Sequence, residues 1–409
     1  MPPAESPLHQ GTPAYRRLTL AMLFAGFSTF SLLYSVQPLL PLFAADYGLS
    51  AEGASLAVSL ATGPLAIGIL FAGILSDRIG RRPLMVWAMF AAGALTLAAA
   101  LVPGWSALLA LRLLTGIALA GVPAVAMAYV AEEVDVASVG AAMGLYIAGS
   151  AIGGMGGRLV ASLVADVAGW RWALGSVGLA GVLMAEGFRR LAPASRGFVA
   201  GSGGHPFAGL AALFRDRALP LLYAEAFLLM GVFVTVYNYA GFRLLAPPYG
   251  LSQAAVGLVF LLYILGSASS AAFGSVAGKI GRRRVFWLPI VLLIGGVAAT
   301  GTRPLPLVIA GIALVTIGFF GAHSIASAWV GRRALGNRGQ AAALYLFFYY
   351  LGSSVLGSAG GFAWSHAGWP GVAWFCLGLG MLALALGVLL ARVAPLPLPE
   401  APDPAPVEP

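Results

Sequence analysis

The chain has 409 residues, of which 60% are hydrophobic and only 9% are charged, whereas soluble domains have about 45–50% apolar and about 25% charged residues. This composition excludes an ordinary soluble protein and predicts one embedded in a lipid bilayer. The net charge of +9 does not indicate nucleic-acid binding, because the basic residues stand at the ends of apolar runs. The single cysteine, Cys376, cannot form a disulfide or a thiolate zinc site within one chain.

Apolar runs follow one another along almost the whole chain. A spanning helix needs about 20 apolar residues, so these runs predict an all-α integral membrane protein with twelve transmembrane helices. The first run follows Arg16 and Arg17 and is too long for a signal-peptide core, so we expect it to be an uncleaved span. The predicted spans are 18–41, 52–75, 84–102, 107–130, 140–164, 171–188, 218–244, 254–277, 285–302, 307–330, 341–364 and 372–391.

The basic residues predict how these spans are oriented. Most of the 23 Lys and Arg residues fall in segments that twelve alternating spans place on the same side as both termini, for example at 81–82 and 282–284. Because Lys and Arg concentrate in cytoplasmic loops, we expect both termini to be cytoplasmic.

An internal repeat predicts two halves of six helices each. Gly48-Leu49-Ser50 recurs as Gly250-Leu251-Ser252, and Gly80-Arg81-Arg82 recurs as Gly281-Arg282-Arg283. Between the halves lies a segment rich in Gly, Pro, Ser and Arg, and a tail rich in Pro and acidic residues ends the chain. We therefore expect an N-terminal cytoplasmic segment 1–17, a first half 18–190, a linker 191–217, a second half 218–391 and a disordered tail 392–409.

A charged loop stands between the second and third predicted spans. The residues that define it are Gly73, Asp77, Arg78, Gly80, Arg81 and Arg82. Their order resembles the loop signature of major facilitator superfamily transporters, and an ordinary basic turn would explain the arginines but not the glycines and the carboxylate. The resemblance implies the two-half facilitator fold and an Asp77 that caps a helix of the other half.

Only the first copy of this loop carries the carboxylate, because the second copy has Gly278 where the first has Asp77. The resemblance also implies that an acidic residue after the fourth helix, Glu132 or Glu133, joins the Asp77 and Arg78 charge cluster. A solvated acidic loop explains the two glutamates equally well.

Polar side chains inside the spans are candidates for function, because they are costly in lipid unless they are paired or wet. The resemblance implies a substrate cavity near the midplane between the halves. The cavity candidates are Tyr34, Gln37, Arg112, Arg158, Tyr237, Asn238, Tyr345 and Tyr349.

Arg112 stands in Leu108-x3-Arg112-x3-Gly116-x4-Gly121, which is similar to the helix-4 motif of proton-coupled facilitators. We therefore also treat Arg112 as a candidate for proton coupling. The alternative is an arginine that snorkels to the nearby membrane surface.

Glu225 and His323 lie at similar depth in the second half and are the further candidates for proton coupling. A carboxylate beside an imidazole at low dielectric can be tuned to exchange protons near neutral pH. The alternative is that Glu225 pairs with Arg215 or Arg217 and that His323 is a packing residue.

The resemblance extends over nearly the whole chain outside the linker and tail. The stretches 32–41, 318–324 and 345–352 are similar to the arabinose-efflux-permease-like branch of bacterial drug:proton antiporters. A glycine stripe on helix 5, from Gly140 to Gly157, partly resembles the antiporter signature but lacks its Gly-Pro pair, and simple helix packing explains it equally well.

These features predict a secondary transporter of the bacterial inner membrane that exports a small organic solute, drug-like or sugar-like, in exchange for protons by alternating access. The alternative within transport is uptake or exchange of a sugar-like or anionic metabolite. A membrane-embedded enzyme would need a paired set of catalytic groups, which the sequence does not indicate. We expect no metal, no cofactor and no nucleotide site, and a monomer whose partners are its substrate, protons and lipid.

Overall fold

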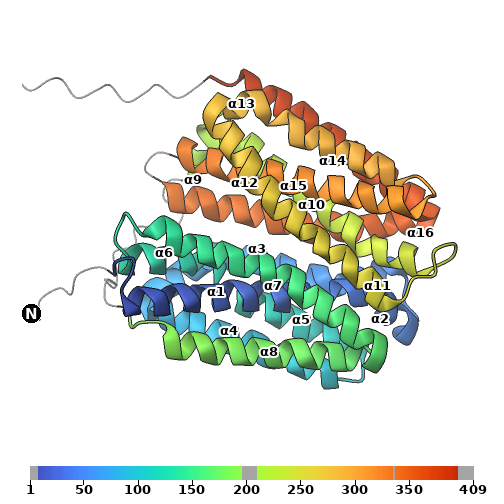
Figure 1. Cartoon of the computed structure of the whole chain (residues 1–409), viewed down its shortest axis with the longest axis horizontal. Helices are drawn as coiled ribbons and strands as arrows, with labels where there is room; N and C mark the ends of the chain where they lie inside the picture. Colours follow the sequence, from blue (N-terminus) through green and yellow to red (C-terminus); the bar gives the residue numbers. More distant parts are fainter. Residues whose placement is uncertain (1–7, 196–209, 335–336, 395–409) are drawn as a thin grey trace, which may run out of the picture.

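The computed structural model describes residues 8–195, 210–334 and 337–394, and the regular secondary structure within them is helical apart from one isolated bridge between Leu8 and Val134. Figure 1 shows the helices in two groups that lie side by side, one formed by the first part of the chain and the other by the second. Parts of three predicted segments lie outside the described residues: 1–7 of the N-terminal segment, 196–209 of the linker and 395–409 of the tail.

The first group contains α1 to α8. Its elements are α1 Pro13–Tyr34, η1 Gln37–Leu39, α2 Leu40–Tyr47, α3 Ala51–Ile79, α4 Arg81–Leu101, α5 Trp105–Leu119, α6 Pro123–Glu133, α7 Val139–Ala168 and α8 Trp170–Leu191. The second group contains α9 to α16. Its elements are α9 Leu210–Arg215, α10 Leu219–Leu245, α11 Gln253–Leu258, η2 Val259–Leu262, α12 Tyr263–Ile280, α13 Arg282–Val285, α14 Trp287–Thr300, α15 Leu305–Arg333 and α16 Arg338–Arg392.

These elements confirm the predicted architecture of twelve helices in two six-helix halves. Ten helical stretches of the described chain are long and apolar enough to cross a membrane. One of them, α16, is two helices joined at Ala367 and Gly368, whose backbone angles are not helical. The 22-residue helix α8 completes the first half.

Several spans are broken where the sequence suggested continuous helices. The predicted span 18–41 ends its first helix at Tyr34 and resumes through η1, and the predicted span 107–130 is interrupted between α5 and α6. Pro38 and Pro123 stand just beyond these breaks. Proline has no backbone N–H to continue the hydrogen-bond ladder, so both helices restart there.

The internal repeat is visible in the backbone. Gly48 and Gly250 both adopt a left-handed conformation, with φ of 63° and 54°, and Gly80 and Gly281 share φ values of 94° and 98°. Only glycine adopts such angles without strain. The repeated sequence triplets and loop copies therefore encode the same turns in the two halves.

The glycine stripe on α7 lies against α1. A Cβ added at Gly149 would lie 2.2 Å from the Leu23 carbonyl oxygen, and one added at Gly153 would lie 2.3 Å from that of Phe27. Small residues allow such close approach of two helices in a membrane. Helix packing is therefore sufficient to explain these two glycines, and they need not indicate an antiporter.

Candidate functional site

The two ends of the helix bundle differ in charge. One end, which we call the basic end, carries the loops with Arg81, Arg82, Arg189, Arg190, Arg282, Arg283, Arg284, Arg332 and Arg333. The other, which we call the opposite end, carries the turns that join α2 to α3 and α10 to α11. The contacts between the two halves differ sharply between these ends.

At the basic end, the loop motif forms a charge cluster inside the first half. The Arg81 guanidinium lies 2.6 Å from the Asp77 carboxylate and 2.9 Å from that of Glu132. Glu132 is thus the glutamate that contacts this cluster through Arg81, whereas the backbone carbonyl of Glu133 accepts a hydrogen bond from the Leu8 amide. Asp77 therefore binds its own loop in this structure.

The hydrogen bonds of Arg82, another residue of the motif, likewise lead to the end of the first half. Arg82 donates to the carbonyl oxygens of Ala192 and Arg189, at 2.9 and 2.6 Å. Arg78 is exposed, and a Cβ added at the exposed Gly73 would meet no atom within 4 Å. No other part of the described chain therefore packs closely against Gly73 in this structure.

The second half has its own charge cluster at the basic end. Arg333 lies 2.9 Å from Asp216, which also accepts hydrogen bonds from the backbone amides of Ala218 and Leu219. Partial burial raises the pKa of Asp216, but these hydrogen bonds outweigh it, so the net pKa lies below the ordinary value. Among the described residues, the ion pairs at this end each join residues of the same half.

At the opposite end, by contrast, the halves contact each other directly. The hydroxyls of Ser59 on α3 and Ser358 on α16 are 2.5 Å apart, and the Ser354 hydroxyl donates to the Ser59 carbonyl oxygen at 2.9 Å. The Gln253 amide donates to the Pro38 carbonyl oxygen at 2.6 Å. These neutral contacts close the interface at this end.

A polar bridge crosses the interface farther inside. The Gln37 side chain donates to the Asn238 amide oxygen at 2.7 Å and accepts from Arg158 Nε at 2.7 Å. The Tyr34 hydroxyl lies 3.3 Å from that of Ser353. The structure thus brings together five residues that the broken helix α1, α7, α10 and α16 contribute, four of them predicted from the sequence.

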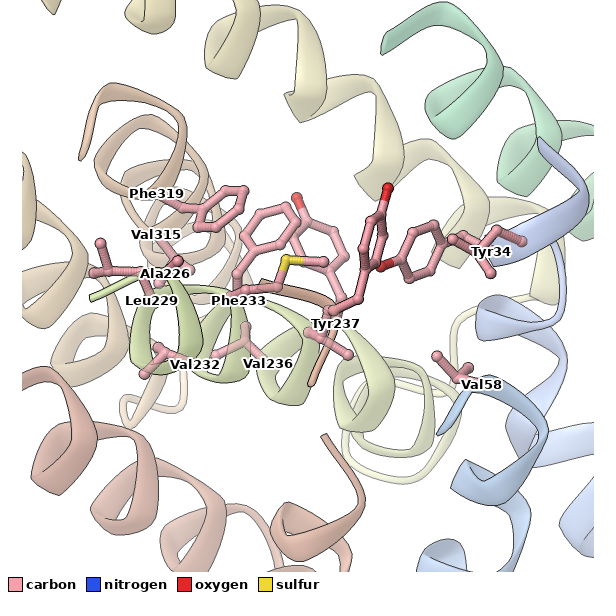
Figure 2. Packing of buried hydrophobic residues seen from close by; sticks show 14 of the residues in the cluster. Tyr34, Val58, Ala226, Leu229, Val232, Phe233, Val236, Tyr237, Val315 and Phe319 are labelled. Atoms are coloured by element: carbon pink, nitrogen blue, oxygen red, sulfur yellow. The ribbon is translucent and has the colours of Figure 1, made fainter. Parts of the chain in front are cut away.

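An aromatic row begins at Arg158 and continues through the second half. The guanidinium carbon lies 4.5 Å from the centre of the Tyr34 ring and 5.1 Å from that of Tyr263. Figure 2 shows Tyr34 facing Tyr237, with Phe233 and Phe319 beyond it. The successive ring pairs are Tyr237–Phe260, Phe233–Tyr237, Phe233–Phe319, Phe319–His323 and His323–Tyr349, with centres 5.4, 4.9, 4.1, 5.8 and 4.9 Å apart.

Arg112 lies apart from this row and is fully buried, which contradicts the alternative of a snorkelling side chain. Its Nη1 and Nη2 donate to the carbonyl oxygens of Leu32 and Leu33 at 2.9 and 2.5 Å, and its Nε donates to that of Ala57 at 2.9 Å. Leu32 and Leu33 belong to the last turn of α1, whose final carbonyls have no helical partners. Arg112 therefore holds the broken end of α1 against α3.

Glu225 is also fully buried, but neither of its carboxylate oxygens has a hydrogen-bond partner among the described residues. It does not pair directly with His323, whose Nδ1 lies 2.9 Å from the Tyr345 hydroxyl. The expected direct pair of Glu225 and His323 is therefore not formed, and His323 contacts Tyr345 instead.

Several residues of this interface were not found from the sequence. Ser59, Ser358, Phe260 and Tyr263 contact the other half or Arg158, yet serine and aromatic residues are ordinary in a span. Their only signal was a hydroxyl group or an aromatic ring within an apolar run, which is shared by many residues that serve packing alone.

Three comparisons place the chain among known proteins. The family model described as Major Facilitator Superfamily matches residues 20–249 and again 228–409. The inner membrane transport protein YnfM of Escherichia coli K12 is 44% identical, over 94% of this chain and 93% of that protein. The uncharacterized MFS-type transporter YybF of Bacillus subtilis 168 is 42% identical, over 95% and 97% of the two chains.

A solved structure shares the fold at low sequence identity. The bacterial homologue of the human lysosomal transporter Spinster, in its inward-facing and unoccupied conformation, matches with a TM-score of 0.74 and 16% identity. The match covers 94% of this chain and 98% of that one.

Proposed function

We propose that this chain, which belongs to the Major Facilitator Superfamily and is a multi-pass secondary transporter rather than an enzyme, exports a small organic solute in exchange for protons. The two halves would rock around the central bridge of Gln37, Arg158 and Asn238. The basic end would face the cytoplasm together with both termini, and the drug:proton antiporter branch that the sequence resembles supplies the direction of transport.

The asymmetry of the interface supports alternating access. Hydrogen bonds join the halves at the opposite end, whereas the charge clusters of the basic end stay within their own halves. With the basic end in the cytoplasm, this is an inward-facing state. In the outward-facing state, Asp77 would leave Arg81 and cap a helix of the second half, as the loop motif implies.

The observation that carries proton coupling is the unpartnered carboxylate of Glu225. An ionised carboxylate in an apolar interior is strongly unfavourable, and Glu225 Oε1 lies beside the place where Ile290 and Phe286 approach Gly387. Glu225 is therefore best accommodated in its protonated form here. A change of surroundings in the other state would let it release the proton, and His323, which contacts Tyr345, is the second candidate for proton coupling.

The test compares driven transport with exchange in proteoliposomes. Radiolabelled ethidium, L-arabinose and benzoate represent a cationic drug, a sugar and an organic anion. For whichever probe is moved, Glu225→Gln should abolish accumulation driven by a pH gradient and preserve exchange, because exchange requires binding and rocking but no net proton release. Wild-type behaviour is expected of Glu186→Gln, which changes a surface carboxylate paired with Arg189.

Two results would contradict the proposal. If no probe moves through the wild-type protein, transport of these solute classes is excluded. If Glu225→Gln still accumulates the probe against its gradient with an unchanged pH profile, the proton does not travel through Glu225.

A further inference from the structure

We propose that the central site recognises organic anions with a flat apolar body, such as aromatic carboxylates, and that Arg158 is the residue that binds the negative charge. This inference rests on the proposed transport function and names the class of its substrate. It follows from the different ways in which the two buried arginines of the first half are used.

Arg158 has hydrogen-bonding capacity left over, whereas Arg112 does not need a ligand. Arg112 uses all three of its nitrogens on backbone carbonyls of its own half. Arg158 is only 2% exposed, and it donates through Nε to Gln37 and through Nη1 to the Gly154 carbonyl oxygen. Its Nη2 has no hydrogen-bond partner among the described residues.

The charge of Arg158 is also unbalanced. No carboxylate forms an ion pair with it among the described residues, and the fully buried Glu225 stands thirteen positions before Asn238 on α10, roughly 20 Å along the helix. A buried charge is normally paired. Here the guanidinium is held by the faces of Tyr34, Tyr263 and Phe260 instead, a weaker substitute for an anion.

The surroundings indicate the shape of the rest of the ligand. The rings of Phe260, Tyr237, Phe233 and Phe319 continue from Arg158 in contact with one another, and they come from α10, α15 and η2. Such a row suits a planar apolar group that stacks on it. A cation would also be attracted to ring faces, but it would be repelled by the unpaired Arg158.

The Gln37 bridge gives the anion a way to influence the interface. Gln37 Oε1 accepts from Arg158 Nε, and Gln37 Nε2 donates to Asn238 of the other half. A carboxylate forms stronger, charge-assisted and bidentate bonds with a guanidinium than an amide oxygen does. It would therefore displace Gln37 from Arg158 and loosen the cross-half bond to Asn238, which favours opening of the opposite end.

The experiment compares three probes of similar shape and different charge. Benzoate, neutral benzamide and cationic benzylamine are each offered for counterflow in proteoliposomes that contain the wild-type protein. We expect benzoate to exchange and the other two to exchange roughly tenfold less or not at all, which corresponds to about 1.4 kcal/mol of discrimination. Arg158→Gln should lose benzoate exchange, whereas Arg158→Lys should retain part of it with a raised half-saturation concentration, since it keeps the charge but not the planar fork.

The control is Arg171→Gln, which changes an exposed arginine of the same half that binds the carbonyl oxygens of Ala100 and Val102. It should exchange benzoate like the wild type. Gel filtration and the melting temperature without ligand show whether each variant is folded. If Arg158→Gln is unfolded, Arg158→Lys provides the test, and its half-saturation concentration for benzoate must be higher than that of the wild type.

Three outcomes would overturn the proposal. They are equal exchange of benzamide or benzylamine, unchanged benzoate exchange by folded Arg158 variants, and no benzoate exchange by the wild type. In each case, movement of ethidium or L-arabinose would leave the transport function standing. Loss of the pH-gradient response in Glu225→Gln tests proton coupling separately from charge recognition by Arg158.

Discussion

The two ends of the interface between the halves use different chemistry. The opposite end is joined mainly by hydroxyl and amide groups, as between Ser59 and Ser358, with one carboxylate, that of Asp166, which accepts from the Ala254 amide. The basic end keeps its charged groups in clusters such as Arg81 with Asp77. A neutral hydrogen bond contributes only about 0.5–1.5 kcal/mol net. A few such bonds can therefore be broken and exchanged for charged contacts at the other end, which is what a two-state transporter requires.

Glycine is the other component of the closed end. A Cβ added at Gly361 on α16 would lie 2.5 Å from the Glu52 Cα atom of the first half, and one at Gly257 would lie 2.4 Å from the Ser162 Cβ atom. No comparable contact between halves is made by Gly73 at the basic end. The closed end is therefore sensitive to side-chain size, and the basic end in this state is not.

The largest effect is expected from Gly361→Leu, which places a bulky side chain in the closed end. Overpacking costs about 1–3 kcal/mol, which would lower the population of this closed state and the rate of exchange roughly 5–150-fold. Counterflow in proteoliposomes measures the loss. The matched control is Gly295→Leu, because a Cβ at Gly295 on α14 meets no atom within 4 Å.

Wild-type rates in both glycine variants would show that close contact at the opposite end is not part of the transport cycle. A loss of rate in both variants would instead indicate a general effect of leucine on folding, which the melting temperatures would reveal.

The fold could be predicted from the sequence because the apolar runs and the internal repeat independently indicated the same architecture. Apolar runs predicted the spans, and Gly80 and Gly281 marked turns that recur in both halves. Helix breaks were missed because a proline such as Pro38 permits a restart without requiring one, and the outcome depends on the partners of the freed carbonyls. Those partners, here Arg112 on another helix, are determined by tertiary packing.

The site was only partly accessible for the same reason. Gln37, Arg158 and Asn238 were candidates because polar groups are rare in spans, but the order in which they bind one another depends on the approach of two halves. Likewise, the motif around Arg112 set it apart from Arg158 but did not predict that Arg112 binds backbone atoms whereas Arg158 lies among rings.

A smaller effect is expected at Arg112, which supports the helix that carries Gln37 to the interface. Arg112→Ala removes three hydrogen bonds, and side-chain hydrogen bonds in membrane proteins average about 0.6 kcal/mol, so the loss is about 2 kcal/mol and roughly 20-fold in transport. Arg112→Lys should retain only part of the rate. It keeps the positive charge, but one ammonium cannot reproduce the planar fork that reaches α1 and α3 together. Wild-type uphill transport by Arg112→Ala would show that α1 needs no such support.

The smallest effect is expected at the basic end, where Asp77→Asn should slow transport and Arg283→Gln should not. The Asp77 side chain is 28% exposed in its ion pair with Arg81, and exposed pairs contribute about 0.2–1 kcal/mol, so its role in this state accounts for at most a fivefold change. The motif implies a second role, in which Asp77 caps a helix of the other half when the basic end closes. The repeated loop has glycine at the corresponding position, Gly278, so Arg283 has no such carboxylate in its own loop.

The measurement compares the transport rates of Asp77→Asn and Arg283→Gln at equal amounts of folded protein. A loss confined to Asp77→Asn would support the latch, whereas wild-type rates in both variants would show that the charged cluster of the basic end takes no part in switching between states.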